Sequence, residues 1–200
     1  MRIAILVEGK TEKAFKPYLT AFLQTKLPDR MPKLDIVPYD GRIPTDGKLK
    51  RVVENLLSNA KQPADAVIAL TDVYTGSVPP DFTTAKDAKN KMREWVGVED
   101  RFYPHVALHD FEAWLLPYWE KIQKITGCNR SSPGSFPEKV NHNKSPSYHL
   151  AEVFRIGQKT QGYIKTRDAG RILKDEDLAA AIEACPELKA FVTTIINLCG

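Results

Sequence analysis

Short hydrophobic runs alternate with amphipathic segments along the first half of the chain. The runs carry few charges, as is typical of strands buried in a sheet, and predict four strands: Ile3–Val7, Leu34–Tyr39, Ala66–Leu70 and Phe102–Leu108. The intervening segments repeat hydrophobic residues every three or four positions and predict three helices: Glu12–Lys26, capped by Thr11, then Lys48–Lys61 and Thr84–Val96. This alternation predicts β-α-β units and therefore a mainly parallel four-stranded sheet flanked by helices, an α/β fold.

The pattern changes after the fourth strand. Asp110–Ile125 predicts a helix with a kink at Pro117, and the residues from Thr126 to Ser147 have the Ser, Pro, Gly and Asn content of loops. Two further helices are predicted at Tyr148–Gln158 and Asp175–Leu198. We therefore expect an α/β domain over residues 1–125, with a basic, mostly helical C-terminal region over residues 126–200 packed on it.

Composition places the chain among ordinary globular proteins. Its 200 residues are 42% hydrophobic and 27% charged, and three scattered cysteines form no Cys-x-x-Cys pair that would indicate disulfides or zinc. No apolar run approaches the ~20 residues that a membrane helix needs, and the N-terminus has no signal-peptide pattern. We expect a cytoplasmic protein without membrane contact.

Charge is distributed unevenly along the chain. The net charge is +4, but residues 121–174 contain eleven Lys and Arg against three Asp and Glu, a balance of +8, so the remainder carries −4. Such asymmetry suggests an acidic active half beside a basic half that could hold a polyanion, although a solvated basic surface without function would look the same.

Three of the four predicted strands end on acids. Glu8 follows the first strand, Asp72 follows the third, and Asp110 and Glu112 follow the fourth, just past His109. Ligands of parallel sheets gather at the carboxyl ends of strands, and adjacent strands are about 4.8 Å apart, so these acids could share a divalent cation. Carboxylates of this kind select Mg²⁺ or Mn²⁺, and Glu12, in the first turn of the following helix, could face the same ion.

Each of these residues also has a structural interpretation. Asp72 could be a turn cap, Glu12 could favour the positive end of its helix dipole, and Asp110 is a plausible N-cap. His109 could equally be a core or capping histidine. The coincidence of three strand ends, more than any single residue, favours a metal site.

The segment Gly9-Lys10-Thr11 superficially suggests a phosphate-binding loop. Such a loop needs G-x-x-x-x-G-K-[ST], and the residues before Gly9 form a strand instead. The segment Gly41–Leu49 has five residues between its glycines and Leu49 where a hydroxyl is required. The sequence therefore argues against ATP hydrolysis by this chain. Gly9 is expected to let the backbone turn sharply without crowding an ion or phosphate.

Four segments in this order resemble a known fold and family. The strand ending in Glu-Gly (Ile5–Glu12) and the strand ending in Asp (Ala66–Gly76) resemble the Toprim fold of topoisomerases, primases and the overcoming-lysogenization-defect (OLD) nucleases. Together with His109–Leu116 and Tyr163–Leu173, they resemble a bacterial Toprim-like family, domain of unknown function 4276 (DUF4276), over nearly the whole chain.

The resemblance implies Mg²⁺- or Mn²⁺-dependent phosphodiester chemistry on nucleic acid. It implies that Glu8 and Asp72 hold metal, with Glu12 as an added ligand. The usual motif is Asp-x-Asp, whereas this chain has Tyr74 at the second acidic position, so a two-metal site requires that Glu112 supply the missing acid. The candidate catalytic residues are Glu8, Asp72, His109 and Glu112. Cations and aromatic rings that could contact phosphates and unpaired bases are Lys10, Tyr74, Tyr163, Lys165, Arg167 and Arg171. Arg171 or Lys165 could instead form a structural ion pair with Asp168.

Two functions from different classes follow. The first is a Mg²⁺-dependent nuclease acting on DNA or RNA, with a role in phage defence and, by analogy, an ATPase partner of the chromosome-maintenance or transporter type. The second is a catalytically weak nucleic-acid-binding or regulatory subunit of an ATPase-containing complex, which Tyr74 favours.

Overall fold

A computed structural model describes residues 1–73, 82–140, 144–157 and 162–200, except for the side chain of Lys10. The four strands are β1 (Arg2–Val7), β2 (Lys33–Pro38), β3 (Ala66–Val73) and β4 (Phe102–Leu108). The helices between them are α1 (Lys10–Lys26), α2 (Asp46–Leu57) and α3 (Ala85–Val96). After β4 come the 3-10 helix η1 (Phe111–Tyr118), α4 (Trp119–Thr126), the 3-10 helix η2 (Pro137–Lys139), α5 (Pro146–Gly157), α6 (Lys165–Leu173), α7 (Leu178–Ala184) and α8 (Pro186–Cys199).

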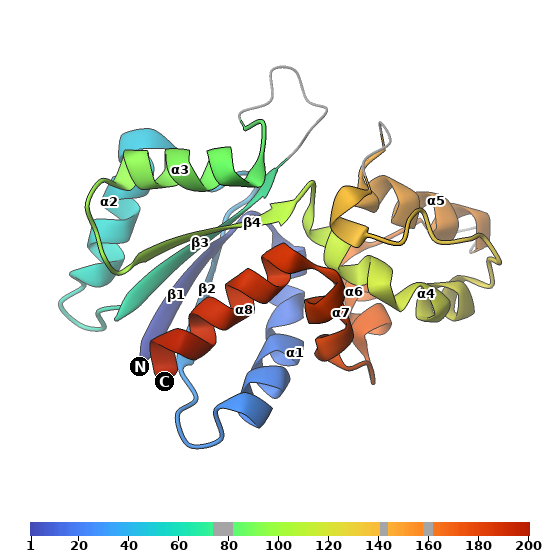
Figure 1. The fold of residues 1–200 in the computed structure, drawn as a ribbon, viewed down its shortest axis with the longest axis horizontal. Helices are drawn as coiled ribbons and strands as arrows, with labels where there is room; N and C mark the ends of the chain where they lie inside the picture. The colour runs from blue at the N-terminus through green and yellow to red at the C-terminus, as the bar shows by residue number, and fades with distance from the viewer. Residues whose placement is uncertain (74–81, 141–143, 158–161) are drawn as a thin grey trace.

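The sheet is parallel throughout, with strand order β2-β1-β3-β4, and thus confirms the predicted α/β class. Successive residues of β1 point to opposite faces, so Ile3 and Ile5 enter one hydrophobic cluster while Ala4 and Leu6 enter another. Figure 1 shows α2 and α3 over one face, and α1 with α8 over the other. Both faces are covered, which explains why the central strands are uninterrupted hydrophobic runs.

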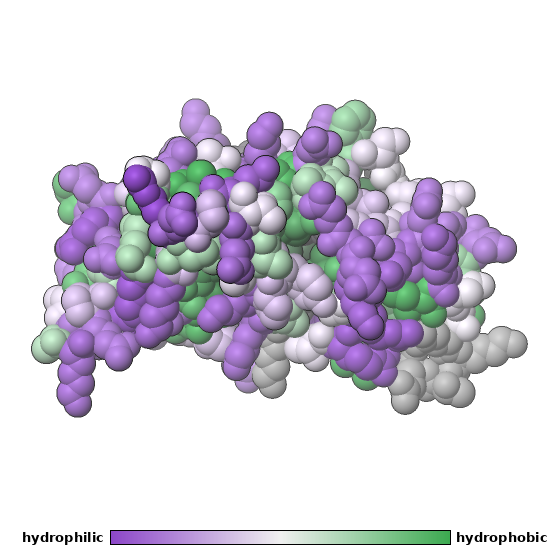
Figure 2. Space-filling view, turned by 90° about the horizontal axis from the view of Figure 1, so that it is seen from below, coloured by the Kyte–Doolittle hydropathy of each residue, from purple (hydrophilic) through white to green (hydrophobic). Residues whose placement is uncertain are grey.

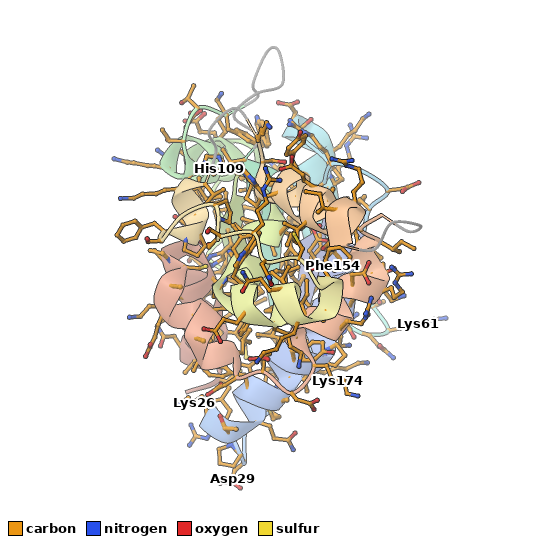
Figure 3. All side chains as sticks on the ribbon, turned by 90° about the vertical axis from the view of Figure 1, so that its right-hand side faces the viewer. Lys26, Asp29, Lys61, His109, Phe154 and Lys174 are labelled. Atoms are coloured by element: carbon orange, nitrogen blue, oxygen red, sulfur yellow. The ribbon has the colours of Figure 1, made fainter. Side chains whose placement is uncertain are left out.

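The C-terminal region lies beyond the carboxyl ends of the strands. In Figure 1 the arrowhead of β4 points toward the lobe that contains α4, α5 and α6. The lobe shares the hydrophobic cluster of the α1 face, because Phe154 of α5 and Ile172 of α6 belong to the same cluster as Ile3 and Leu19. Figure 3 shows Phe154 within this lobe. The division into two parts at residue 125 stays a prediction, but the later residues pack closely on the earlier ones.

Several element boundaries differ from the sequence prediction. β3 continues to Val73, so Asp72 lies within the strand instead of after it. The helix expected over 110–125 is the 3-10 helix η1 followed by α4, since Pro117 has no N–H to donate to a regular α-helical ladder. Helix α1 begins after Gly9, so Thr11 lies inside it.

The C-terminal helices differ as well. The helix expected over 175–198 is divided into α7 and α8 at Cys185, because Pro186 starts a new helix readily but cannot donate within a continuing one. Helix α6 was not predicted, although four of its nine residues are buried on one side: Asp168, Ala169, Ile172 and Leu173.

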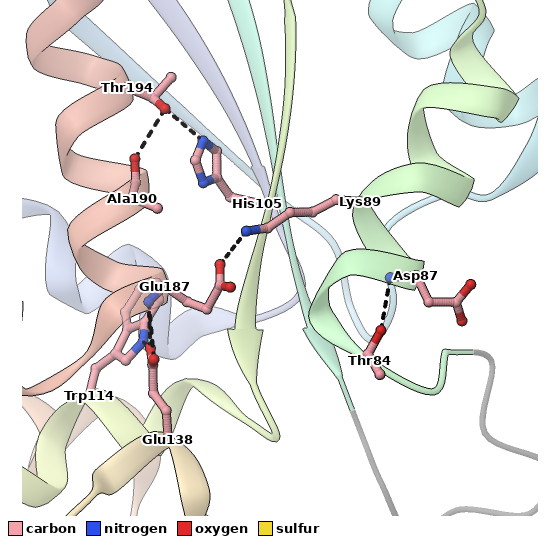
Figure 4. Close-up of polar contacts among 9 residues, drawn as sticks. All are labelled: Thr84, Asp87, Lys89, His105, Trp114, Glu138, Glu187, Ala190 and Thr194. Atoms are coloured by element: carbon pink, nitrogen blue, oxygen red, sulfur yellow. Dashed lines mark hydrogen bonds and ion pairs between the residues drawn. The ribbon is translucent and has the colours of Figure 1, made fainter.

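Polar contacts fasten α8 to the edge of the sheet. His105 of β4 contacts the hydroxyl of Thr194 at 3.0 Å, and Lys89 of α3 forms an ion pair with Glu187 of α8 (Figure 4). The face shown in Figure 2 is mostly hydrophilic, and hydrophobic side chains form separated patches on it. Among the described residues, none of the helices is long and apolar enough to cross a membrane.

Candidate active site

A cleft of about 480 Å³ lies at the carboxyl ends of the strands. The end of β1, the loop after β2, the end of β3, the start of η1 and the start of α6 all contribute to it. Its walls are formed by Glu8, Gly9, Thr11, Glu12, Asp40, Gly41, Arg42, Asp72, Phe111, Glu112, Ile164, Lys165 and Thr166. The cleft therefore lies between the sheet and the C-terminal region, and each supplies part of it.

Four predicted metal ligands meet in this cleft: Glu8, Glu12, Asp72 and Glu112. All four are buried, with exposed fractions between 0% for Glu112 and 8% for Glu8. Buried carboxylates are rare unless they are paired or bind a cation. Four buried carboxylates at one end of a sheet therefore destabilise the fold unless another group compensates their charge.

Strand register brings Glu8 and Asp72 together. β1 pairs with β3 so that Leu6 lies beside Ala69, which places Glu8 level with Thr71. The Thr71 hydroxyl donates a hydrogen bond to the Glu8 carboxylate. The loop after β2 is fixed to the same point, since the Gly41 amide donates to the Glu8 carbonyl at 3.2 Å.

Gly9 permits a close approach of the Glu12 carboxylate. Its φ of −151° and ψ of −173° are extended values that any residue adopts, so the expected sharp turn is not the reason for a glycine here. A Cβ atom at Gly9 would lie 3.1 Å from Glu12 Oε2. Glycine therefore makes room for the acid.

The clustered acids hold their protons more tightly than isolated ones. Burial raises the pKa of Glu8 to about 7, and Glu12 adds to this while the Thr71 hydrogen bond and the charge of Arg42 oppose it. Burial also raises the pKa of Asp72 well above its usual value, and the charges of Glu8 and Glu12 raise it further. The pKa of Glu12 is raised mainly by burial. Strongly perturbed acids in a cleft are typical of functional sites.

Glu112 is held by two residues of the C-terminal region. The Lys165 ammonium lies 3.3 Å from Glu112 Oε1, and the Tyr163 hydroxyl lies 3.5 Å from the same oxygen. Burial, with the charge of Asp110, raises the pKa of Glu112 to about 7 although Lys165 opposes the shift. Burial lowers the pKa of Lys165, but the charges of Glu112 and Asp72 outweigh it, and the pKa is raised. Lys165 is therefore a firmly charged ammonium at the acidic wall.

Both arginines predicted to bind phosphate, Arg167 and Arg171, form ion pairs with Asp168. Arg167 donates to Asp168 at 2.9 and 2.8 Å, and Arg171 donates to it at 3.0 Å. The described lining of the cleft includes neither arginine. The Asp168 ion pair that was an alternative for Arg171 is present, whereas Lys165 pairs with Glu112.

The remaining predicted residues fall into three groups. His109 is in the left-handed backbone region, with φ of 71°, at the turn after β4, and the described lining of the cleft does not include it (Figure 3). The Tyr163 ring packs against Phe154, with ring centroids 5.3 Å apart, so it is already engaged by the core. Tyr74 and the side chain of Lys10 lie outside the described part of the chain.

Arg42 and Thr71 were missed by the sequence analysis. Arg42 lines the cleft from the loop after β2, where the sequence suggested only a polar loop and a false phosphate-binding motif. Its guanidinium acts on Glu8, while Thr71 donates to the same carboxylate. An arginine after a strand is a weak signal, since only the sheet order brings β2 beside β1.

The donors of the cleft suit a hard divalent cation. Their oxygens are the ligands that Mg²⁺ and Mn²⁺ prefer, and an ion would relieve the repulsion among them. In the residues that the structure describes, no three acids, histidines or cysteines are grouped closely enough to hold an ion by themselves. An ion at this place would therefore take one or two of the carboxylates directly and complete its coordination with water, an arrangement that Mg²⁺ accepts.

The parallel sheet and the acids at its carboxyl end define a Toprim-like α/β protein. Residues 7–196 match the family described as a domain of unknown function, DUF4276, and the chain belongs to that family. No match was found among curated proteins.

One solved structure supports the fold, and a second is similar to it. The C-terminal region of the Burkholderia pseudomallei OLD protein is 12% identical, with a TM-score of 0.55 over 99% of this chain and 98% of that one. A second similar structure is the C-terminal region of the OLD protein of Xanthomonas campestris pv. campestris, 16% identical, with a TM-score of 0.49 over 98% and 94% of the two chains. At such identities the first structure supports the fold alone.

Proposed function

We propose that this chain is a Mg²⁺-dependent nuclease that hydrolyses phosphodiester bonds in DNA or RNA. The observation that carries the proposal is the convergence of four buried acids and a charged lysine on one cleft at the carboxyl end of the sheet. The similarity to OLD proteins agrees with this class of activity.

Glu8 and Asp72 would hold the metal directly, with Glu12 as an added ligand through one of its waters. When bound, the metal would polarise a phosphoryl oxygen and lower the pKa of the attacking water. Thr71 orients Glu8 by donating to it, and Gly9 leaves room for Glu12. Among the described side chains that line the cleft, the cations are Arg42, from the loop after β2, and Lys165, from the start of α6. Both would bind non-reacting phosphate oxygens and so position the substrate across the acids.

A second function is a catalytically weak nucleic-acid-binding or regulatory subunit. The ion pair between Lys165 and Glu112 favours it, because this lysine already neutralises one of the acids. In either case we propose an ATPase partner and a role in phage defence. The solved relatives are C-terminal regions, so in those proteins another segment precedes this fold.

Nuclease assays with Mg²⁺ and with Mn²⁺ on single- and double-stranded DNA and RNA test the proposal. The conservative variants Glu8→Gln and Asp72→Asn should each lower the rate at least about 100-fold, because several kcal/mol of transition-state stabilisation is lost. Glu8→Ala and Asp72→Ala should behave alike.

Glu138→Gln is the matched control. Glu138 is also buried, at 5% exposure, but it accepts hydrogen bonds from Trp114 and the Glu187 amide, away from the cleft (Figure 4). Its variant should retain activity. Equal rates in wild type and the cleft variants would end the nuclease proposal. Nucleic-acid binding without metal-dependent cleavage, reduced in Arg42→Gln and Lys165→Gln, would favour the regulatory subunit.

A further inference from the structure

Two aromatic rings of the C-terminal region are exposed to solvent. Of the aromatic side chains that the structure describes, Phe136 and Tyr148 are the exposed ones, at 65% and 46%, and the others are buried or half-buried. Neither ring belongs to the two hydrophobic clusters that the described residues form. Packing of the core therefore does not account for an aromatic side chain at either position.

A lysine lies over each of the two rings. The Lys139 ammonium is 4.9 Å from the centre of the Phe136 ring, and the Lys144 ammonium is 4.6 Å from the centre of the Tyr148 ring. A cation in this position is attracted to the face of the ring and holds its orientation. Both lysines are exposed as well, so each pair offers a flat apolar surface beside a positive charge.

The fold brings the two pairs to the same turn. Phe136 and Lys139 line a cavity of about 420 Å³ together with Leu108, the last residue of β4. Tyr148 follows Ser147, whose amide donates a hydrogen bond to Asp110 Oδ2 at 3.1 Å. Leu108 and Asp110 are two residues apart and thus within about 7 Å of each other. Figure 3 marks the turn between them by His109.

An exposed ring beside an ammonium group suits an unpaired nucleotide. The base can stack on the ring, and the lysine can bind the adjacent phosphate. The bases of a duplex are stacked on one another, so their faces are not accessible to such rings. A protein partner could also cover exposed aromatic rings, but lysine is depleted from the cores of protein interfaces. The lysine over each ring therefore favours nucleic acid.

We infer that Phe136 and Tyr148, each with its lysine, form a stacking surface for single-stranded nucleic acid at the turn after β4. The inference rests on the proposed action on nucleic acid and narrows its substrate class to strands with unpaired bases. The surface lies beside the acidic cleft, because the two residues that follow Asp110 line that cleft. A strand stacked here is held next to the acids.

Fluorescence anisotropy in EDTA, with a labelled thymidine strand and a duplex of equal length, about 20 nucleotides, tests the inference. The chelator keeps metal-dependent cleavage out of the measurement. Wild type should bind the single strand more tightly than the duplex. Phe136→Ala and Tyr148→Ala should each weaken single-strand binding at least about fivefold, as the loss of one stacked base does, and should leave duplex binding unchanged.

Two control variants separate stacking from a general change of the surface. Tyr148→Phe keeps the ring and should bind the single strand like wild type. Ile156→Ala removes another exposed apolar side chain of α5, at 43% exposure, and should also bind like wild type. All of these side chains are exposed, so thermal unfolding of the variants should match that of wild type.

The lysines are tested by the salt dependence of binding. Lys139→Gln and Lys144→Gln should each reduce the slope of log affinity against log salt concentration by about 0.7, as the loss of one phosphate contact on a single strand does. Unchanged slopes in both variants would contradict the phosphate contacts and overturn the surface as described.

Binding and cleavage together distinguish this surface from the proposed nuclease. Single-strand binding that is equal in wild type, Phe136→Ala and Tyr148→Ala would overturn the surface and leave the rings to a protein partner, whatever the cleavage assays show. Equal affinity for single strand and duplex, or an equal loss in Ile156→Ala, would also overturn it. The expected losses in a protein that cleaves nothing with Mg²⁺ or Mn²⁺ would support the surface and end the nuclease proposal. If wild type neither binds nor cleaves nucleic acid, both fall.

Discussion

Asp72 and Asp168 are both buried aspartates, but the protein surrounds them in opposite ways. Asp168 accepts hydrogen bonds from the Ile164 amide and from two guanidinium groups, and these bonds lower its pKa although burial alone would raise it. Burial raises the pKa of Asp72, and four further acids raise it more. The protein itself compensates Asp168, whereas we propose that a cation from outside compensates Asp72. A buried acid therefore indicates a site only when its partners are missing.

The largest effect is expected from Asp168→Ala. The change removes the acceptor for Arg167, Arg171 and the Ile164 amide, so it should lower the free energy of unfolding by about 3 kcal/mol. Urea denaturation measures this. A loss below about 1 kcal/mol would contradict the view of Asp168 as the anchor of α6. Metal binding per folded molecule should stay unchanged.

The second prediction concerns pH. Glu8 and Glu112 have folded-state pKa values of about 7 against an ordinary value of 4.5, so the folded protein binds more protons between these limits. Without metal, the contribution of these two groups to stability should therefore be greatest below pH 4.5 and should decrease as the pH rises to about 7. The loss should be on the order of 2 kcal/mol.

Urea denaturation in chelator at pH 5 and pH 7.5 measures this difference. Glu8→Gln should reduce the pH dependence because one of the two titrating groups is gone, while Glu112 remains. Asp168 does not contribute in this window, since its lowered pKa keeps it ionised throughout. An increase in stability from pH 5 to pH 7.5 would contradict the expected repulsion.

Asp72→Asn should change the free energy of unfolding in the opposite direction to Asp168→Ala. Without metal it removes one of several repelling charges and should stabilise the fold by about 1–2 kcal/mol. With Mg²⁺ at 100 times its dissociation constant, wild type should gain about 2.7 kcal/mol, and the variant much less. Thermal unfolding with and without Mg²⁺ shows both effects. If Asp72→Asn instead destabilised the metal-free protein, Asp72 would be an aspartate that the protein itself compensates, as Asp168 is.

The smallest effect separates two glycines. A Cβ atom added at Gly47 of α2 would meet nothing within 4 Å beyond its own helix backbone, so Gly47→Ala should stabilise the fold by about 0.4–1 kcal/mol. In Gly9→Ala the new Cβ atom would lie 3.1 Å from Glu12 Oε2. This variant should therefore show no such increase in stability, and its Mn²⁺ binding should be weaker. Chemical denaturation and Mn²⁺ titration compare the two. Equal gains in stability with unchanged Mn²⁺ binding would remove the role given to Gly9.

The sequence by itself determined the fold class and the acids of the cleft. Buried runs such as Ile3–Val7 and amphipathic segments such as Thr84–Val96 are local patterns, so they predict strands and helices without knowledge of the neighbours. Because parallel strands end at one edge of a sheet, the acids after β1, within β3 and after β4 could be placed together in advance.

Only the tertiary structure decided which Lys and Arg side chains lie at the cleft. Lys165, Arg167 and Arg171 are near one another in the sequence, but helix α6 turns the first toward Glu112 and the other two toward Asp168. Arg42 reaches the cleft because β2 lies beside β1, and Asp110 bonds to Ser147 because α5 packs against η1. Side-chain partners depend on contacts distant in sequence, so local patterns could not reveal them.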